Sequence, residues 1–374
     1  MASMKLTAVK PNGLPGEYAR RLGIKNVYVE MTNICNFDCN FCPTRLSERK
    51  PGRIELGLFK KIVDEIAGTG IARRLQFHVL GEPLLHPDLG EAIAYATGKG
   101  LKTALTTNGS LFSEDKVKEL IASRLDHLSI SLQTPEEEEH ASRGTSLNFQ
   151  SYYEKIMEAI AQFRRNSGID LTVALMHTSS KKFFALDHDV GVNREERRFK
   201  DKVARLVYDM RRAMGQPQGR EEIDKALAKI NVNASTTLCL DNDTKIYVQL
   251  FWDWGNAFTS RKIFPAKFAA CGYAFKHLGI LHDGRVTMCC SDYEGRTTLG
   301  NVIDNSLVEI LESDQTRELV SGFERARVIH PFCQRCLGSP SRMFAWLKGL
   351  GSIYLFKLKH HPVDNTRRIN LFSH

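Results

Sequence analysis

The fold is decided by one short stretch of the sequence, Asn33-Ile34-Cys35-Asn36-Phe37-Asp38-Cys39-Asn40-Phe41-Cys42. Its three cysteines have the spacing C-x3-C-x2-C, and a run of β-forming residues comes directly before it. Thiolates are soft ligands that suit iron–sulfur clusters, and three of them on a four-iron cluster leave one iron without a protein ligand. A substrate or a cofactor can bind at that open iron. A zinc site without its fourth ligand is the alternative that the spacing leaves open.

Short β-rich runs alternate with longer helical patterns from Asn26 to Leu250, which predicts βα units on a parallel sheet. The fold class is therefore α/β, with a partial (β/α)6 TIM-type barrel. The cysteine loop leaves the carboxyl end of the first strand, where barrel enzymes place their chemistry. We expect strands at Asn26–Met31, Arg74–Leu80, Leu101–Thr106, Asp126–Leu132, Ile169–Met176 and Lys245–Leu250. We expect helices at Leu58–Ala67, Asp88–Thr97, Ser113–Ser123 and Tyr152–Arg165, with Ser113 as an N-cap.

The domain organisation follows from changes in composition along the chain. Residues 1–25 are a lead-in, and residues 26–260 form the barrel. A charged insertion at 181–233, with helical patterns at Lys202–Met214 and Glu221–Ile230, is expected over the barrel mouth. After residue 260 the chain becomes rich in glycine and cysteine, which predicts a small auxiliary domain at 261–340. Residues 341–374 are a basic amphipathic tail, expected either to pack on the barrel or to contact a membrane surface.

A second group of cysteines lies in the predicted auxiliary domain. Cys333 and Cys336 form a C-x2-C pair, and Cys289 follows Gly284 on a predicted hairpin. With Cys271 they make a set of four thiolates, which can close a cluster or form a zinc ribbon.

The first motif resembles the hallmark of the radical S-adenosylmethionine (SAM) superfamily, C-x3-C-x-aromatic-C, with Phe41 as the aromatic residue. The resemblance implies a 4Fe-4S cluster that binds SAM. Positions that match the family's SAM contacts recur in order along the barrel, although Leu80 replaces the first glycine of the Gly-Gly-Glu segment: Gly81, Glu82, Thr106, Asn108, Ser131 and Arg143. The second group is similar to the twitch and SPASM auxiliary domains of this superfamily, which implies a second 4Fe-4S cluster. No cysteine follows Cys336, so one auxiliary cluster is expected.

The resemblance implies that a 5'-deoxyadenosyl radical takes hydrogen from a substrate. We expect a small polar substrate, such as a sugar or an aminocyclitol, and a dehydrogenase whose auxiliary cluster accepts an electron. The motif begins at residue 35, which leaves no room for a leader-peptide-binding module of about 80 residues. An electron donor such as flavodoxin or ferredoxin is the expected partner.

Three residues are candidates for a direct catalytic role. Asp253, which follows the sixth strand, is a candidate base, and a turn residue is its alternative role. Cys290 and Cys239 are candidate hydrogen-atom donors, with small buried residues as the alternative. A donor cysteine would fit a radical epimerase or a peptide-modifying enzyme.

Composition sets the remaining limits. Nine cysteines, no secretory signal at residues 1–10 and no apolar run of about 18 residues indicate a cytoplasmic protein whose cysteines bind metal. The net charge of +9 permits an anionic partner. A non-catalytic module that binds nucleic acid is not expected, because the residues that match SAM contacts would then have no purpose.

Overall fold

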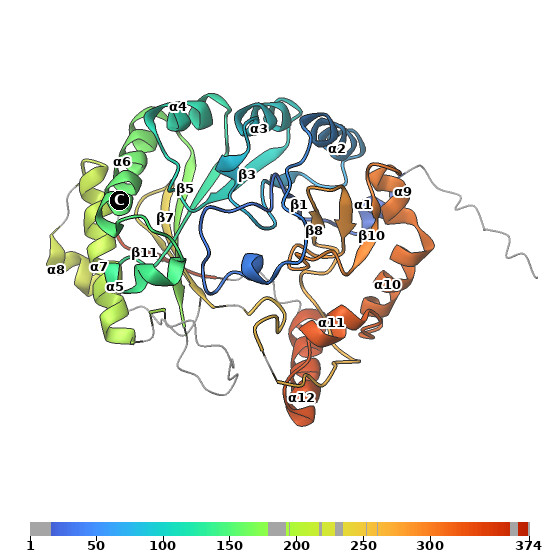
Figure 1. Cartoon of the computed structure of the whole chain (residues 1–374). Coiled ribbons are helices and arrows are strands. Elements are labelled where there is room, and N and C mark those ends of the chain that lie inside the picture. Colours follow the sequence, from blue (N-terminus) through green and yellow to red (C-terminus); the bar gives the residue numbers. More distant parts are fainter. Residues whose placement is uncertain are drawn as a thin grey trace, which may run out of the picture.

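Neighbouring parallel strands form an open, barrel-like sheet at the centre of the computed structural model (Figure 1). The structure describes residues 16–178, 192–193, 195–216, 219–228, 235–251, 253–259, 261–359 and 366–372. These parallel strands follow the order β1-β2-β3-β4-β5-β7, and each strand pairs in parallel with the next. Their bounds are β1 Asn26–Val29, β2 Arg74–Gln76, β3 Lys102–Thr107, β4 His127–Gln133, β5 Asp170–His177 and β7 Thr244–Leu250. The partial (β/α)6 barrel expected from the sequence is confirmed.

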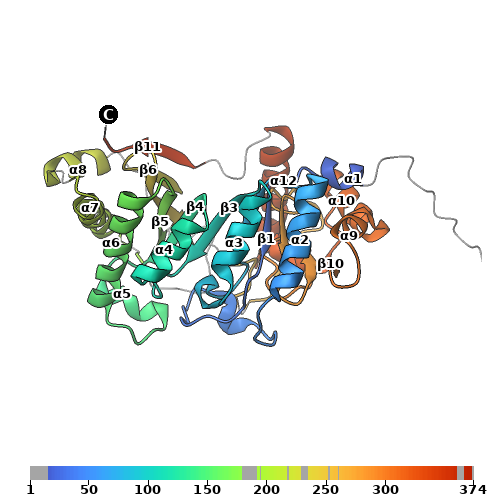
Figure 2. The same ribbon diagram turned by 90° about the horizontal axis from the view of Figure 1, so that it is seen from above.

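Helices cover the outer face of this sheet and lie side by side along it in both views (Figures 1 and 2). Side chains alternate along each strand, so Leu128 and Ile130 of β4 are buried under the helices while Ser129 and Ser131 face the concave side. Ser113 is an N-cap as predicted, because its hydroxyl accepts a hydrogen bond from the Lys116 backbone N–H. These outer helices are α2 Leu56–Thr69, α3 Leu89–Gly98, α4 Glu114–Ala122, α6 Phe149–Asn166 and α7 Glu196–Ala213.

The sheet continues beyond the barrel at both edges, and the described residues together form one sheet of 11 strands. Strand β8, His277–Ile280, pairs in parallel with β1, and a hairpin then adds β9, Arg285–Thr287, and β10, Thr298–Asn301. At the other edge, β6, Thr236–Cys239, pairs antiparallel with β7, and β11, Arg367–Asn370, pairs in parallel with β6. The predicted boundary near residue 260 therefore divides a chain whose sheet is continuous.

The carboxyl-terminal part of the chain adds helices outside the barrel wall. Its elements are α9 Leu307–Glu312, α10 Asp314–Glu324, α11 Pro331–Cys336, α12 Arg342–Ile353 and a π-helical turn at Tyr354–Leu358. The other short helices are α1 Glu17–Arg21, α5 Glu137–His140, α8 Arg220–Leu227 and the 3-10 turns Pro43–Leu46, Pro83–Leu85 and Ala141–Arg143. None of the helices in the described ranges combines the length and hydrophobicity that a membrane span requires.

The predicted insertion at 181–233 is only partly described. Helix α7 belongs to the outer helical layer, because the Tyr153 hydroxyl on α6 donates to the Asp209 carboxylate of α7 at 2.8 Å. The expectation that this helix lies over the barrel mouth is wrong: its apolar stripe packs on the wall. Residues 181–191, 194, 217–218 and 229–234 of the insertion, with Trp252 and most of the lead-in, lie outside the described residues.

Candidate active site

The first three cysteines lie on the loop that follows β1. This loop is held against the segment around Arg143, since the Asp38 N–H donates to Gly144 O at 3.2 Å and the Asn40 N–H donates to Ser142 O at 2.9 Å. A Cβ atom at Gly144 would lie 2.1 Å from Asp38 O, so the two segments approach at a distance that only glycine allows. The contact brings Arg143, which lies 101 residues after Cys42 in the sequence, to the cysteines.

The thiols of Cys35, Cys39 and Cys42 interact electrostatically within one buried environment. Burial raises the pKa of Cys35 to about 12, and the nearby carboxylate of Glu82 acts in the same direction. Burial also raises the pKa of Cys39 and of Cys42, against which the Arg143 charge acts. All three are therefore neutral in the metal-free chain at pH 7, and binding of iron must displace their protons.

Gly81 and Glu82 lie against the same loop, beyond the end of β2. Gly81 has φ of 77°, and a Cβ atom there would lie 2.2 Å from Thr32 O. The Glu82 N–H donates to Ile34 O at 2.8 Å, which positions the acid beside Cys35. The sequence match at these two positions thus corresponds to a close backbone contact with the cysteine loop.

The Glu82 carboxylate is buried and accepts three hydrogen bonds. The donors are the Thr107 hydroxyl at 2.7 Å, the Asn108 N–H at 2.7 Å and the Leu84 N–H at 3.0 Å. Burial nevertheless raises its pKa above the ordinary value. A cationic partner such as an amino group would stabilise the ionised form.

Arg143 is the largest fully buried side chain, at 1% exposure. Its guanidinium stacks over the rings of Phe37 and Phe41, 5.1 and 5.8 Å from their centroids, and donates to Leu132 O at 3.2 Å. Its Nε is buried and has no hydrogen-bond partner among the described residues. A buried cation with an unused donor, beside three thiols, fits an anionic ligand such as a carboxylate.

The other predicted SAM contacts lie nearby on the concave face of β3 and β4. The Asn108 side chain donates to the Asn36 side chain of the cysteine loop at 2.9 Å. Thr106 and Ser131 are half-buried, and the Ser131 hydroxyl accepts from the Gln133 amide at 2.8 Å. These polar side chains line the space between the cysteine loop and the inner face of the sheet.

The four auxiliary cysteines also come together. Burial raises the pKa of Cys271 to about 11 and that of Cys336 to about 12, and each of these thiols interacts electrostatically with Cys289. Burial raises the pKa of Cys333, and electrostatic interaction with Cys271, Cys336 and Cys289 acts in the same direction. Cys271 lies six residues before β8, Cys289 lies two residues after β9, and Cys333 and Cys336 lie on helix α11.

Cys290 and Cys239, the two candidate hydrogen donors, are in different parts of the fold. The Cys290 thiol is hydrogen-bonded to Cys289, which lowers the pKa of Cys289 and raises that of Cys290. Cys239 pairs with Lys245 at the start of β7, whereas the candidate loop around Asp253 follows the end of that strand. Cys239 therefore lies at the end of β7 opposite to that loop, and a donor role for it stays a prediction.

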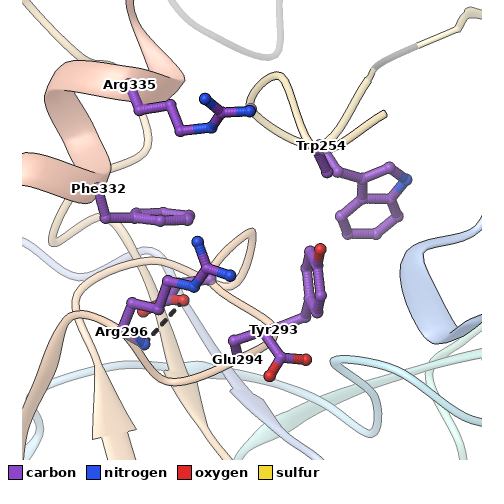
Figure 3. A pocket seen from close by; sticks show the side chains of 9 residues that line it. Trp254, Tyr293, Glu294, Arg296, Phe332 and Arg335 are labelled. Carbon is purple, nitrogen blue, oxygen red and sulfur yellow. Dashed lines mark hydrogen bonds between the residues drawn. The ribbon is translucent and has the colours of Figure 1, made fainter. Parts of the chain in front are cut away.

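A pocket of about 320 Å³ is lined by residues of the loop after β7, of the loop after Cys290 and of helix α11 (Figure 3). Phe332 and Arg335 extend into it from α11, opposite Trp254, while Tyr293 and Arg296 enter from the loop after Cys290. Its other lining residues are Gly255, Ala257, Asp292 and Glu294.

Lining residues of the pocket contact one cysteine of each group. Tyr293 and Trp254 pack edge to face, with ring centroids 6.4 Å apart, in a cluster that includes Cys42. Gly255, next to Trp254 in the chain, approaches the auxiliary group, since a Cβ atom at Gly255 would lie 2.8 Å from the Cys336 sulfur. Sequence reasoning missed Tyr293, Glu294, Arg296 and Arg335, although their proximity to Cys290 and Cys336 was a signal.

Asp253 lies beside this pocket and not in its wall. Its carboxylate accepts from the Asn256 N–H at 3.1 Å, and its carbonyl accepts from the Ala257 N–H at 3.0 Å. These bonds are those of a turn residue. Glu294 is better placed for proton transfer, because its Oε1 is buried and has no hydrogen-bond partner within the described ranges.

A buried ion-pair network joins the two halves of the site. Glu30, at the end of β1, accepts two bonds of 2.7 Å from the Arg49 guanidinium and one of 3.0 Å from His282 Nδ1. Burial acts to raise the pKa of Glu30, but the bonds from His282 and Arg49 outweigh it and hold that pKa below its ordinary value. The network fixes the hairpin between β8 and β9 to the base of the cysteine loop.

The donor sets fit the clusters that the motifs suggest. In the described ranges, no three His, Cys, Asp or Glu side chains converge on a point suited to a single metal ion. The thiolates of a four-iron cluster bind different irons and need no such convergence. Three buried thiols beside Arg143 and Glu82 fit a cluster with one open iron, and four thiols fit a closed one.

Two family models match the chain, and they match the two parts of this site. The model for the radical SAM superfamily matches residues 29–178, and a model for an iron–sulfur cluster-binding domain, SPASM, matches residues 271–337. These domains imply 4Fe-4S clusters and SAM as cofactors.

Relatives and solved structures agree with these matches. The chain is 30% identical over 178 residues to the PqqA peptide cyclase of Gluconobacter oxydans, covering 46% of this chain and 48% of that one. It is 29% identical over 169 residues to the AdoMet-dependent heme synthase of Nitratidesulfovibrio vulgaris, covering 43% and 44%. The matches thus span about half the length of these relatives.

Among solved structures, Streptococcus suis SuiB bound to S-adenosylmethionine superposes with a TM-score of 0.53 at 13% identity, covering 80% of this chain and 68% of that one. At that identity the likeness concerns the fold. Together with the buried cysteine loop and the auxiliary thiols, these matches show that the chain belongs to the radical SAM superfamily and carries a C-terminal SPASM-type iron–sulfur domain.

Proposed function

We propose that this radical SAM enzyme oxidises a small polar molecule bound in the pocket between the two cysteine groups. One observation carries the proposal: lining residues of the pocket approach both cysteine groups, since the Tyr293–Trp254 wall packs with Cys42 and a Cβ atom at Gly255 would lie 2.8 Å from the Cys336 sulfur. A substrate held there lies between the two cofactor sites. The polar lining and the volume of about 320 Å³ suit a sugar or aminocyclitol.

In this proposal Cys35, Cys39 and Cys42 hold the first cluster, and the auxiliary cluster is held by Cys271, Cys289, Cys333 and Cys336. When bound, the clusters and SAM supply a 5'-deoxyadenosyl radical that takes a hydrogen atom from the substrate, and an acceptor for one further electron. Glu82 holds the SAM amino group and Arg143 its carboxylate. A flavodoxin or ferredoxin is the proposed source of the reducing electron.

The pocket residues bind the substrate and take its proton. Oxidation of an alcohol to a carbonyl group removes one hydrogen atom, one electron and one proton. Glu294 is placed to accept the proton, in preference to Asp253, because its buried oxygen has no other partner among the described residues. Arg296 and Arg335 orient oxygen atoms of the substrate, and Phe332 limits the access of water.

The test uses the reconstituted full chain with SAM and dithionite, incubated anaerobically with a panel of sugars, polyols and aminocyclitols. We expect a product two mass units lighter than one of these substrates. Arg296→Ala should lose this product and keep substrate-independent 5'-deoxyadenosine formation, while Arg325→Ala, an exposed arginine outside the pocket, should keep both. Replacing Cys333 and Cys336 should preserve 5'-deoxyadenosine and abolish the product. Equal product from Arg296→Ala and the unaltered chain would contradict the proposal.

Peptide modification is the second candidate, and the similarity to a PqqA peptide cyclase favours it. A redox-neutral variant of this chemistry, epimerisation, would use Cys290 as hydrogen donor beside the auxiliary thiols. Reaction in deuterated water separates the cases. A product that carries one solvent deuterium at an inverted carbon, and that the Cys290→Ala variant does not form, would show an epimerase and contradict the dehydrogenase proposal.

A further inference from the structure

Helix α12 and the π-helical turn after it direct their large apolar side chains outward. Figure 1 shows α12 at the lower edge of the molecule, away from the barrel wall. Trp346 is 64% exposed and Leu358 is 69% exposed. We call the exposed set the tail face; its members are Met343, Phe344, Trp346, Leu347, Leu350, Tyr354, Leu355 and Leu358.

The inner side of the same helix is built from small residues. Ala345 is buried, and a Cβ atom at Gly349 would lie 2.3 Å from Phe268 O. The Ser352 hydroxyl accepts from the Ala270 N–H at 3.0 Å. Since these positions recur at i, i+4 and i+7, they form one stripe, and the large residues occupy the remaining surface. The expected packing of the apolar stripe on the barrel is therefore not what the structure has.

The surroundings of the tail face are basic. Residues 325–363 contain no aspartate or glutamate, and they contain Arg325, Arg327, Arg335, Arg342, Lys348, Lys357 and Lys359. The neighbouring loop adds Lys267 and Phe268, and Phe268 is 65% exposed. The adjoining helix α10 carries Asp314, Glu318 and Glu324, and the backbone carbonyl of Glu324 accepts from the Lys357 ammonium at 2.7 Å.

We propose that the tail face binds the surface of a membrane with anionic lipid headgroups, with α12 lying in the interface. An apolar face with tryptophan and tyrosine, flanked by lysine and arginine, is the composition of an interfacial helix. Two copies of the chain would place these like charges against one another, which disfavours self-association through the same face. The proposal is independent of the substrate and of the reaction.

The experiment is co-sedimentation of the full chain with vesicles of phosphatidylcholine alone or mixed with phosphatidylserine. We expect binding to the mixed vesicles, and a loss of about tenfold or more in the double variant Trp346→Ser/Leu350→Ser. Lys348→Gln and Lys359→Gln should each weaken binding about fivefold, and only on the anionic vesicles. Ile303→Ser is the matched control, because Ile303 is an apolar residue 59% exposed outside the tail face.

Three outcomes would overturn the proposal. They are no sedimentation of the unaltered chain, equal binding by the double variant, and a dimer in analytical ultracentrifugation that the double variant abolishes. The last would make the face an interface between copies. Formation of 5'-deoxyadenosine in vesicle-free solution should be the same in all variants, which separates this test from that of the catalytic proposal.

Discussion

Replacing Glu30 with alanine removes the carboxylate at the centre of the buried ion-pair network. The side chains of Glu30 and Arg49 are 0% and 5% exposed, so the change leaves a buried guanidinium without its counter-charge. Breaking a buried pair in this way costs about 3–5 kcal/mol. An unfolding entropy of about 2.1 cal/mol/K per residue gives roughly 0.8 kcal/mol/K for 374 residues, so Tm should fall by about 4–6 °C.

Thermal unfolding of the iron-free chain at pH 7, followed by circular dichroism, measures this change. Glu30→Gln, which keeps the shape of the side chain, should lower Tm by less than Glu30→Ala does. The double variant Glu30→Ala/Arg49→Met should be more stable than Glu30→Ala alone, because no charge is left unpaired. A Tm within about 1 °C of the unaltered chain, or a double variant less stable than Glu30→Ala, would refute the reasoning.

The lowered pKa of Glu30 gives this pair a pH dependence. A carboxyl group with a folded-state pKa below its ordinary value of 4.5 stabilises the fold above that value. The stabilisation is lost as the pH falls through the folded-state pKa. The difference in stability between the unaltered chain and Glu30→Gln should therefore shrink on acidification below pH 4.5.

Three further predictions concern the cofactor sites. The anaerobically reconstituted chain should hold about eight irons, and the triple change Cys35→Ala/Cys39→Ala/Cys42→Ala should leave about four and abolish SAM cleavage; complete loss of iron would contradict independent sites. Gly81→Ala should lower Tm by much more than Gly70→Ala does. Both residues have positive φ, but a Cβ atom at Gly81 would lie 2.2 Å from Thr32 O, whereas one at Gly70 would meet nothing within 4 Å. Glu82→Ala and Arg143→Ala should each weaken SAM binding in equilibrium dialysis and leave the iron content unchanged. Unaltered SAM affinity in both variants would contradict the prediction that these residues contact SAM.

Sequence reasoning succeeded where the chemistry is local. The C-x3-C-x2-C spacing and the strand before it are contiguous, and the period of the βα units placed every barrel strand within a few residues. The network of Glu30, Arg49 and His282 could not be predicted, because nothing in the sequence pairs positions 19 and 252 residues apart. The pocket could not be predicted from the sequence for the same reason, since only tertiary packing brings Trp254 to Tyr293. Strand β6 has only four residues and is defined by its partners β7 and β11.

The pairing of β8 with β1 makes the auxiliary region a poor candidate for excision. A chain cut after residue 260 would leave β1 as an edge strand with unpaired backbone groups, which is a template for aggregation. It would also remove His282, which donates a hydrogen bond to Glu30 in the Glu30–Arg49 pair. The two cysteine motifs are therefore separate in the sequence, but the parts of the chain that carry them do not form separate folding units. Transfer of the auxiliary region to another barrel would have to include the edge of β1 with which β8 pairs.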